Sequence, residues 1–379
     1  MRSVQDIPVL ENIPVLLRTS LNAEVVDGKV TSDFRLRSAL PTIQYLQQRH
    51  ARVVLSSHIS GQGTESLRPM YEAMRAWIPG LTFCEVSTGA RARHAVRSLE
   101  PGGVVMLENL RRDKGEERNS PEFVRLLAEL ADVFVQDSFD TCHRRHASIV
   151  GVPELLPSYA GMQVVREVTE LSKARVPKSP SLAIIGGAKF TTKQPVLEAL
   201  LARYDRVFVG GALANDFMVE SGYNVGASLV SLDADKLAIR KLLGNPKLML
   251  PLDEVVADPD ATSGVGDVVS LSAVPRTKAV LDDGPKTVGA LASRAASART
   301  IVWNGPLGLY ERGFTEGTEE LAKAIAASSA YSVVGGGDTV AAIERLGISQ
   351  RFSFISTGGG AMLDYLAHGT LPGITALTQ

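Results

Sequence analysis

The sequence predicts an α/β protein made of two Rossmann-like, doubly wound parallel-sheet lobes joined by a hinge helix. Short apolar runs alternate with segments of helical periodicity through both halves of the chain, a rhythm typical of parallel sheets covered by helices on both faces. Glycine-bearing turns follow several of these runs, as a ligand site along the carboxyl edge of a sheet requires. At 379 residues, the chain is also longer than one hydrophobic core usually supports, which favours two domains.

The first half supplies the elements of the first predicted lobe. Strands are expected at residues 15–17, 53–55, 81–83, 104–107 and 133–135. Helices are expected at about residues 33–49, 67–77, 91–99 and 121–130. In the first helix Leu36, Leu40 and Ile43 share one face, while Pro41 predicts a kink or a break. The charged run at residues 111–118 is expected to form a solvated loop beyond Arg111.

The second half repeats the alternation. Strands are expected at residues 182–185, 207–209, 248–250, 300–302, 333–334 and 352–355. A helical stretch at residues 161–173, closed by prolines at 177 and 180, is interpreted as the connector. The first lobe then covers residues 1–160 and the second 161–360. Asp253, Glu254 and Asp258 are expected in a solvated loop rather than at a metal.

Composition limits the possible partners and compartment. The net charge of −1, from 40 basic and 41 acidic residues, argues against nucleic acid or an anionic membrane as a partner. No apolar run approaches the roughly 20 residues that span a bilayer, and residues 1–6 lack the apolar stretch of a signal peptide. Cys84 and Cys142 have no metal-binding spacing, which favours reduced thiols. We expect a cytoplasmic protein.

The stretch Gly335-Gly336-Gly337-Asp338-Thr339 is the most informative motif. It follows an apolar run and precedes a helical segment. Glycines at such a turn let backbone N–H groups approach an anion, and the helix N-terminus adds partial positive charge. A carboxylate beside a phosphate nest requires a mediating cation. The motif therefore indicates contact with a magnesium nucleotide.

Cationic and hydrogen-bonding groups collect at the strand ends of the first half. Arg18, Asn22 and His58 are expected after strands, Arg35 begins a helix, and further arginines follow the later strands. The carboxyl ends of parallel strands meet at one edge of the sheet, so these groups are expected to converge. A guanidinium binds phosphate and carboxylate alike. The pattern predicts a small, multiply anionic substrate.

The second half carries the complementary chemistry. Glycine turns accompany a set of polar side chains: Lys189, Lys193, Asn304, Glu311 and Asp338. Phosphate nests beside lysines and a carboxylate predict a nucleotide site, although Walker A and dinucleotide-binding patterns are absent. An anion site on one lobe and a nucleotide site on the other suit phosphoryl transfer, which depends on in-line positioning and charge neutralisation.

At these residues the chain resembles the phosphoglycerate kinase family over almost its whole length. The motifs that carry the resemblance are Leu40-Pro41-Thr42-Ile43, Glu108-Asn109-Leu110-Arg111, His143-Arg144-Arg145-His146, Gly186-Gly187-Ala188-Lys189, Asp283-Gly284-Pro285-Lys286-Thr287, Trp303-Asn304-Gly305-Pro306, Gly335-Gly336-Gly337-Asp338-Thr339 and Ser356-Thr357-Gly358-Gly359-Gly360. The resemblance implies a monomer whose tail, from about residue 361 to 379, returns to the first lobe. It also implies reversible transfer of the ATP γ-phosphoryl group to the carboxylate of 3-phosphoglycerate, giving 1,3-bisphosphoglycerate and ADP, with Mg²⁺.

The resemblance implies a role for each matching residue. The acid substrate would be held by Ser20, Asn22, Arg35, His58, Arg111 and Arg144. The nucleotide would be held by Lys189, Lys193, Gly211, Asn304, Glu311, Gly335, Gly336, Gly337, Asp338 and Thr339, with Glu311 on the ribose and Asp338 on the metal. Arg35, Lys189 and Gly337 would act in catalysis, Lys189 and Arg35 on the moving phosphoryl group.

Departures from the family pattern leave two alternatives open. Ser20 stands in place of a carboxylate, Gly61 in place of an arginine and Asp140 in place of a glycine. These changes concern the acid, so the chain could be a related kinase for a different small carboxylic acid. Thr192 in place of an aspartate and Phe354 in place of a histidine motivate the second alternative, a non-catalytic nucleotide-binding homologue.

Overall fold

The computed structural model describes residues 1–59, 63–188 and 190–378, and divides the chain into two compact units. Unit 1 comprises Met1–Thr169 and Thr370–Gln379, and unit 2 comprises Glu170–Gly369. Each unit is built around a six-stranded sheet in which every neighbouring pair of strands is parallel. The predicted α/β class is therefore confirmed.

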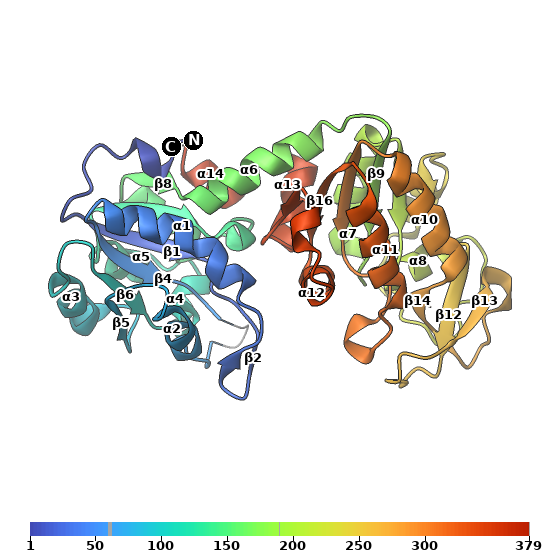
Figure 1. The fold of residues 1–379 in the computed structure, drawn as a ribbon, viewed down its shortest axis with the longest axis horizontal. Coiled ribbons are helices and arrows are strands. Elements are labelled where there is room, and N and C mark those ends of the chain that lie inside the picture. The colour runs from blue at the N-terminus through green and yellow to red at the C-terminus, as the bar shows by residue number, and fades with distance from the viewer. Residues whose placement is uncertain (60–62, 189, 379) are drawn as a thin grey trace. The chain divides into compact units, whose positions relative to one another are not determined.

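The sheet of unit 1 has the strand order β5-β6-β4-β1-β7-β8, with helices along both of its faces (Figure 1). Its central strands are apolar and buried on both faces, as a covered parallel sheet requires. The strands are β1 (Pro14–Thr19), β4 (Arg52–Ser56), β5 (Leu81–Cys84), β6 (Val104–Leu107), β7 (Val133–Asp137) and β8 (Ser158–Ala160). A hairpin adds β2 (Val25–Val26) and β3 (Lys29–Val30).

The helices of unit 1 are α1 (Phe34–Gln48), α2 (Arg68–Met74), α3 (Gly89–Arg97), α4 (Lys114–Glu117), α5 (Pro121–Ala128), the beginning of α6 (Met162–Arg175) and α14 (Pro372–Ala376). A kink or a break was predicted at Pro41; the helix α1 runs through that residue without a break, so the second of these alternatives is wrong. Leu36, Ile43 and Leu46 are fully buried on its inner face, and their packing holds the helix together where one backbone hydrogen bond is missing.

Unit 2 contains a parallel sheet of order β11-β10-β9-β15-β16-β17 and a separate three-stranded sheet of order β13-β12-β14. The parallel strands are β9 (Ser181–Ile185), β10 (Arg206–Val209), β11 (Leu248–Met249), β15 (Thr300–Asn304), β16 (Tyr331–Gly335) and β17 (Phe354–Ile355). The helices are α7 (Phe190–Arg203), α8 (Ala212–Glu220), α9 (Lys236–Leu243), α10 (Pro285–Ser297), α11 (Glu316–Ala327), α12 (Gly337–Arg345) and α13 (Gly360–His368).

The three-stranded sheet is a feature that the sequence pattern did not predict. It consists of β12 (Asp253–Ala257), β13 (Asp267–Ser270) and β14 (Ala279–Asp283), all antiparallel. Asp253 and Glu254 lie inside β12 and are 2% and 1% exposed, so the solvated loop expected there is wrong. Asp253 accepts hydrogen bonds from the backbone N–H groups of Lys286 and Thr287 and so caps α10.

The boundary between the units falls within α6, between Thr169 and Glu170. The helix α13, expected to begin the returning tail, belongs to unit 2, where the Tyr365 hydroxyl bonds Ser172 at 2.9 Å and the carbonyl of Leu366 accepts from Arg203 at 2.6 Å. In the structure the chain rejoins unit 1 at Thr370. Within the described residues, no helix has the length and apolar character to cross a membrane.

Candidate functional site

His58 lies among the arginines of unit 1 that were predicted to bind an anion. It follows β4 at the carboxyl edge of the sheet and is 3% exposed. Burial holds the pKa of His58 well below its ordinary value, and nearby positive charges lower it further: those of Arg18, Arg111, Arg144 and Arg35. Three of the predicted acid-binding arginines therefore lie close enough to His58 to act on its charge. The ring is neutral at physiological pH.

The tautomer of His58 is set by Arg18. Nη2 of Arg18 lies 3.0 Å from Nδ1 of His58. A guanidinium donates hydrogen bonds and accepts none, so Nδ1 must accept and the ring proton must sit on Nε2. His58 is thereby prepared as a neutral donor through Nε2–H, which suits an anionic or hydroxyl oxygen.

Arg18 was expected after the first strand, but it lies inside β1 and is 1% exposed. Its guanidinium donates to the Ser148 hydroxyl at 2.9 Å, and that hydroxyl donates to Glu116 at 2.6 Å. Glu116, in the run expected to be a solvated loop, is 1% exposed. The expected solvated loop is therefore wrong for Lys114–Glu117, which form α4, and for the buried side chain of Glu116. Burial raises the pKa of Glu116, and the charge of Arg18 opposes the rise. A basic residue within an apolar strand was the signal available in the sequence.

Ser20 and Asn22 follow β1, and Arg35 reaches the backbone of Asn22. Arg35, near the start of α1, donates from Nη1 to the backbone carbonyl of Asn22 at 2.7 Å. Ser20 is 5% exposed, and its Oγ has no hydrogen-bond partner among the residues that the structure describes. A buried hydroxyl left without a partner costs free energy, so a ligand group placed there would gain a hydrogen bond.

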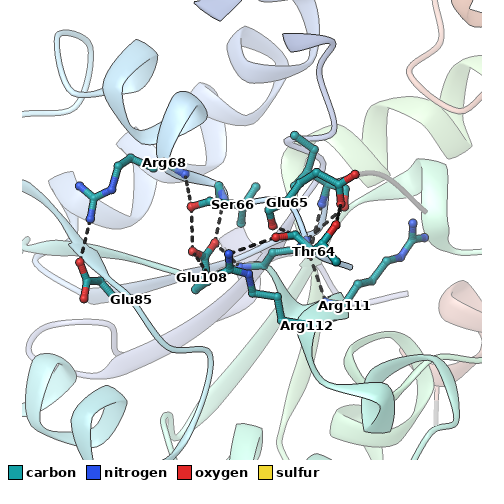
Figure 2. A network of polar contacts seen from close by, with 11 residues as sticks. Thr64, Glu65, Ser66, Arg68, Glu85, Glu108, Arg111 and Arg112 are labelled. Carbon is teal, nitrogen blue, oxygen red and sulfur yellow. Dashed lines mark hydrogen bonds and ion pairs between the residues drawn. The ribbon is translucent and has the colours of Figure 1, made fainter. Parts of the chain in front are cut away.

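Figure 2 shows the network that positions Arg111. The buried carboxylate of Glu108 accepts from the Ser66 hydroxyl, from the Leu67 backbone N–H and from Arg112, at 2.8, 2.8 and 3.0 Å. The side chain of Arg111 extends away from Arg112 (Figure 2) and lies 3.5 Å from Glu117. Burial, together with the charge of Arg144, lowers the pKa of Arg111. Glu108 thus fixes the backbone next to Arg111, and the Arg111 side chain lies near the charges of Arg144 and Arg18.

Arg144 follows the 3-10 helix Phe139–Thr141 and is exposed. The pKa of the neighbouring His146 is lowered to about 4 by burial and by the charges of Arg144 and Arg111. Asp140 faces this group: it accepts from the Ser138 hydroxyl at 2.6 Å, and its negative charge acts on Arg18. Carboxylates therefore accompany the arginines: Asp140 here, and Glu116, whose charge acts on Arg18 and on Arg111. Gly61, the third departure near the acid, lies outside the described residues.

In unit 2 the glycine turns after three neighbouring strands pack against one another. A Cβ on Gly186, after β9, would stand 2.2 Å from the carbonyl oxygen of Pro306, and one on Gly211, after β10, would stand 3.1 Å from the same oxygen. Gly305, after β15, has φ +95° and would place a Cβ 2.6 Å from the Gly186 carbonyl carbon. Only glycine permits this approach. The three turns therefore lie against one another along this edge of the sheet.

The turn after β16 joins this edge. Gly336 has φ +102°, and a Cβ there would stand 3.2 Å from the Gly305 nitrogen. Asn304 donates to the carbonyl of Gly359 at 3.2 Å and lies beside Gly335. Thr339 is fully buried, and its Oγ1 has no partner within the described part of the chain. As at Ser20, a ligand group placed beside this hydroxyl would gain a hydrogen bond.

Asp338 and Glu311 form the acidic part of this edge. Asp338 lies in the first turn of α12, and its pKa is raised by burial and by the negative charge of Glu311. Among the described residues, no three potential ligands from histidine, cysteine, aspartate and glutamate are grouped as a metal centre would need. Magnesium commonly binds through one or two carboxylates together with substrate phosphates. Asp338 beside a phosphate nest fits that mode.

Lys193 lies in the first turn of α7, beside the glycine turns. A Cβ on Gly187 would stand 4.0 Å from Nζ of Lys193, so the ammonium group reaches the backbone of that turn. Burial lowers the pKa of Lys193 to about 8, against the opposing charge of Asp364. A phosphate would favour the charged form again. Lys189, predicted to act on the moving phosphoryl group, lies outside the described residues.

Comparisons with known proteins agree on one family. A family model described as phosphoglycerate kinase matches residues 4–369. The phosphoglycerate kinase of Moorella thermoacetica is 42% identical over 383 residues, which cover 98% of this chain and 97% of that protein. The phosphoglycerate kinase of Thermus thermophilus is 43% identical over 376 residues, 96% of each chain. The chain belongs to the phosphoglycerate kinase family.

Solved phosphoglycerate kinases share the fold over the full length. The structure from Pyrococcus horikoshii matches with a TM-score of 0.89 at 32% identity, and the structure from Coxiella burnetii with 0.81 at 37% identity. Each match covers 100% of this chain and 98% of the solved chain. The predicted membership in the phosphoglycerate kinase family is confirmed. Phosphoglycerate kinases are ATP-dependent phosphotransferases that act on a carboxylate.

Proposed function

We propose that this chain catalyses the reversible transfer of the γ-phosphoryl group of ATP to the carboxylate of 3-phosphoglycerate, giving 1,3-bisphosphoglycerate and ADP. The observation that carries the proposal is the family match across residues 4–369, with cationic groups at one sheet edge and glycine turns at the other. We further propose that Mg²⁺ accompanies the nucleotide and that the enzyme is a cytoplasmic monomer, as the family resemblance implies.

The acid would bind at the carboxyl edge of unit 1. Arg35, Arg111 and Arg144 offer guanidinium groups to its phosphate and carboxylate, and neutral His58 offers Nε2–H. Ser20 and Asn22 would complete the polar lining. Because the arginines already depress the pKa of His58, the site attracts an anion without needing a charged imidazole.

The nucleotide would bind at the carboxyl edge of unit 2. Lys193 and the turn Gly335–Gly337 would hold the phosphates, with Gly211, Asn304 and Thr339 around them, and Glu311 would hold the ribose. Asp338 would hold the magnesium ion, which when bound neutralises phosphate charge. Arg35, Lys189 and Gly337 would surround the moving phosphoryl group, where electrostatic stabilisation of oxygen charge is the main requirement.

A coupled assay with ATP, Mg²⁺ and 3-phosphoglycerate tests this function. Asp338→Asn should lower kcat by about 10²–10³-fold, since it removes the proposed metal ligand. The matched control Asp258→Asn removes an exposed carboxylate that pairs only with Lys278 among the described residues, and should keep full activity. Folded protein that forms no product at millimolar 3-phosphoglycerate would contradict the proposal.

A related kinase for another small carboxylic acid is the second candidate. The favouring observation is the buried, unpartnered Oγ of Ser20 in the described part of the chain, a neutral group where the family pattern has a carboxylate. Measuring ADP release with a panel of phosphorylated and unphosphorylated carboxylic acids separates the two candidates. A clear preference for 3-phosphoglycerate would remove this one.

The third candidate, a non-catalytic nucleotide-binding homologue, is motivated by Thr192 and Phe354. It predicts nucleotide affinity without phosphoryl transfer. Transfer that is lost in Lys189→Ala or Asp338→Ala would eliminate this candidate, because background contamination would not respond to either substitution.

A further inference from the structure

A cavity of about 570 Å³ lies in unit 2, between helices α10 and α11 and the three-stranded sheet. Figure 1 shows α10 and α11 side by side, with β12 and β14 next to them. None of the described residues proposed above for the nucleotide lines this cavity. It is therefore a separate space, within the usual size range of small-molecule pockets.

The walls of the cavity are largely apolar. Val255 and Val268 contribute from β12 and β13, Val288 and Ala292 from α10, and Phe314 from the segment before α11. Val268 is 56% exposed at the edge, while Phe314 is 1% exposed. An apolar ligand body would cover Val268 and gain the usual hydrophobic free energy.

Asp282 sets a buried carboxyl group into this apolar lining at the end of β14. It is 3% exposed, and its two oxygens accept from the backbone N–H groups of Asp283 and Gly317 at 2.9 and 3.0 Å. Each carboxylate oxygen has a second lone pair that these bonds leave unused. Burial and the negative charge of Glu316 raise the pKa of Asp282 to about 7. A bound cation would offset that cost and favour the ionised form.

Asp283 also lines the cavity, but its carboxyl group is engaged elsewhere. Burial, together with the charge of Glu254, raises the pKa of Asp283 well above the ordinary value. Asp283 lies opposite Glu254 across β14 and β12, so its carboxyl group faces Glu254 within the sheet. Asp282 is therefore the carboxyl group that we assign to the ligand.

The net charge at the rim has the same sign as the Asp282 carboxylate. Glu316, Glu320 and Lys323 line the opening. Lys323 pairs with Glu320 at 2.7 Å, so their charges largely cancel. Glu316 and Asp282 remain, and both attract a positive ligand. Apolar walls with a net negative polar end match a molecule that has an apolar body and one cationic head.

We propose that this cavity is a second ligand site, which binds a small organic cation made of an amine on an apolar body. The ammonium group donates to Asp282, with Glu316 at the rim, and the apolar body packs between Val255, Val288 and Phe314. The site is independent of the acid and the nucleotide.

Isothermal titration of the full chain with 3-phenylpropylamine and with 3-phenylpropan-1-ol tests the proposal. The two probes share an apolar body and differ in charge. The amine should bind at least about tenfold more tightly, as a charge-assisted hydrogen bond implies. Saturating Mg-ADP should leave the amine affinity unchanged. Equal affinity for the two probes, or competition by Mg-ADP, would overturn the proposal.

Two variants of α10 locate the binding. Ala292→Trp fills the cavity and should weaken amine binding by about tenfold or more, whereas Ala296→Trp adds the same bulk at an exposed position outside the lining and should leave it unchanged. Asp282→Asn should abolish the preference for the amine over the alcohol. If that variant does not fold, the comparison of amine with alcohol on the parent protein and the comparison of the two Trp variants still test the proposal. An Ala292→Trp protein that keeps its amine affinity refutes the proposal.

Discussion

At the scale of single residues, Arg18 is the side chain that organises the proposed acid site. It is buried in β1, sets the tautomer of His58, and reaches Glu116 through the Ser148 hydroxyl. Burial lowers the pKa of Arg18, while the charge of Glu116 opposes that change. Each buried charge thus depends on the other, and removing one leaves the other uncompensated.

We predict that Arg18→Met lowers the free energy of unfolding by about 3 kcal/mol, because the Glu116 carboxylate loses its compensating charge. The double variant Arg18→Met/Glu116→Gln should recover part of that loss, since no buried charge remains. Urea unfolding of the single and double variants measures both effects. Strictly additive losses would show that the two side chains do not interact.

A second residue-scale feature is the pair Glu254 and Asp283, directly opposite each other on β12 and β14. Both are buried, and neither Glu254 oxygen has a donor among the described residues. Burial raises the pKa of both carboxyl groups well above the ordinary value, with Asp253 and Asp282 adding negative charge. Simultaneous ionisation of both carboxyl groups is therefore disfavoured in the folded protein.

Because the folded-state pKa values are raised, this pair stabilises the fold fully below the unfolded value of about 4. That stability is lost as pH rises through the raised pKa values, since the unfolded chain then releases protons that the folded chain retains. We predict that Glu254→Gln reduces the decline in melting temperature between about pH 5 and 8. The exposed control Asp258→Asn should leave the decline unchanged. An unaltered pH profile for Glu254→Gln would contradict this account.

At the scale of elements, the proposed nucleotide site depends on glycine turns that no other residue could form. Gly305 combines a positive φ with a contact too short for any Cβ. By contrast Gly289, inside α10, would place a Cβ in open space. The chemical change from glycine to alanine therefore has opposite expected effects at the two positions.

We predict that Gly305→Ala lowers the free energy of unfolding by about 1–3 kcal/mol, from backbone strain and overpacking. It should also weaken Mg-ADP binding, because the turn must move away from Gly186. Gly289→Ala should raise stability by about 0.4–1 kcal/mol, since alanine favours the helix. Thermal unfolding with and without Mg-ADP compares the two. A Gly305→Ala protein as stable as the parent would argue against the close turn.

At the scale of the whole molecule, residues from both ends of the chain build unit 1. The N–H of Gly373 donates to the carbonyl of Cys142 at 2.8 Å, and Leu371 and Ile374 are 2% and 8% exposed. A Cβ on Gly373 would stand 2.9 Å from Cγ2 of Ile149. The last segment is therefore part of the packing of unit 1 and not a surface tail.

We predict that Gly373→Val destabilises unit 1 by about 1–3 kcal/mol through overpacking against Ile149 and Cys142. Nucleotide affinity should be unchanged, because the proposed nucleotide residues all belong to unit 2. Hydrogen exchange of unit 1 and a Mg-ADP titration measure the two effects. The exposed control Thr375→Val should change stability by no more than about 0.5 kcal/mol. Equal loss of protection in both units would contradict the assignment of the segment.

The sequence predicted the parallel sheets because central strands buried on both faces are continuous apolar runs, as in Val104–Leu107. It also placed His58 and Asn304 at strand ends, where the structure has them. It missed β12, which contains the two acidic residues Asp253 and Glu254, and it missed the burial of Glu116. In both cases a carboxylate side chain carries no local sign that it is buried. Partners 32 residues apart, such as Glu116 and Ser148, can be recognised only in the folded chain.

The amino-acid sequence by itself determined the α/β architecture, the family and the chemical type of each sheet edge. These follow from local periodicity and from residues such as Gly336, whose backbone conformation few other residues adopt. Tertiary structure alone decided the tautomer of His58, the raised pKa values of Glu254 and Asp283, and the cavity beside Asp282. Each of these depends on burial and on neighbours from distant elements, and both are properties of the packed chain rather than of any segment of it.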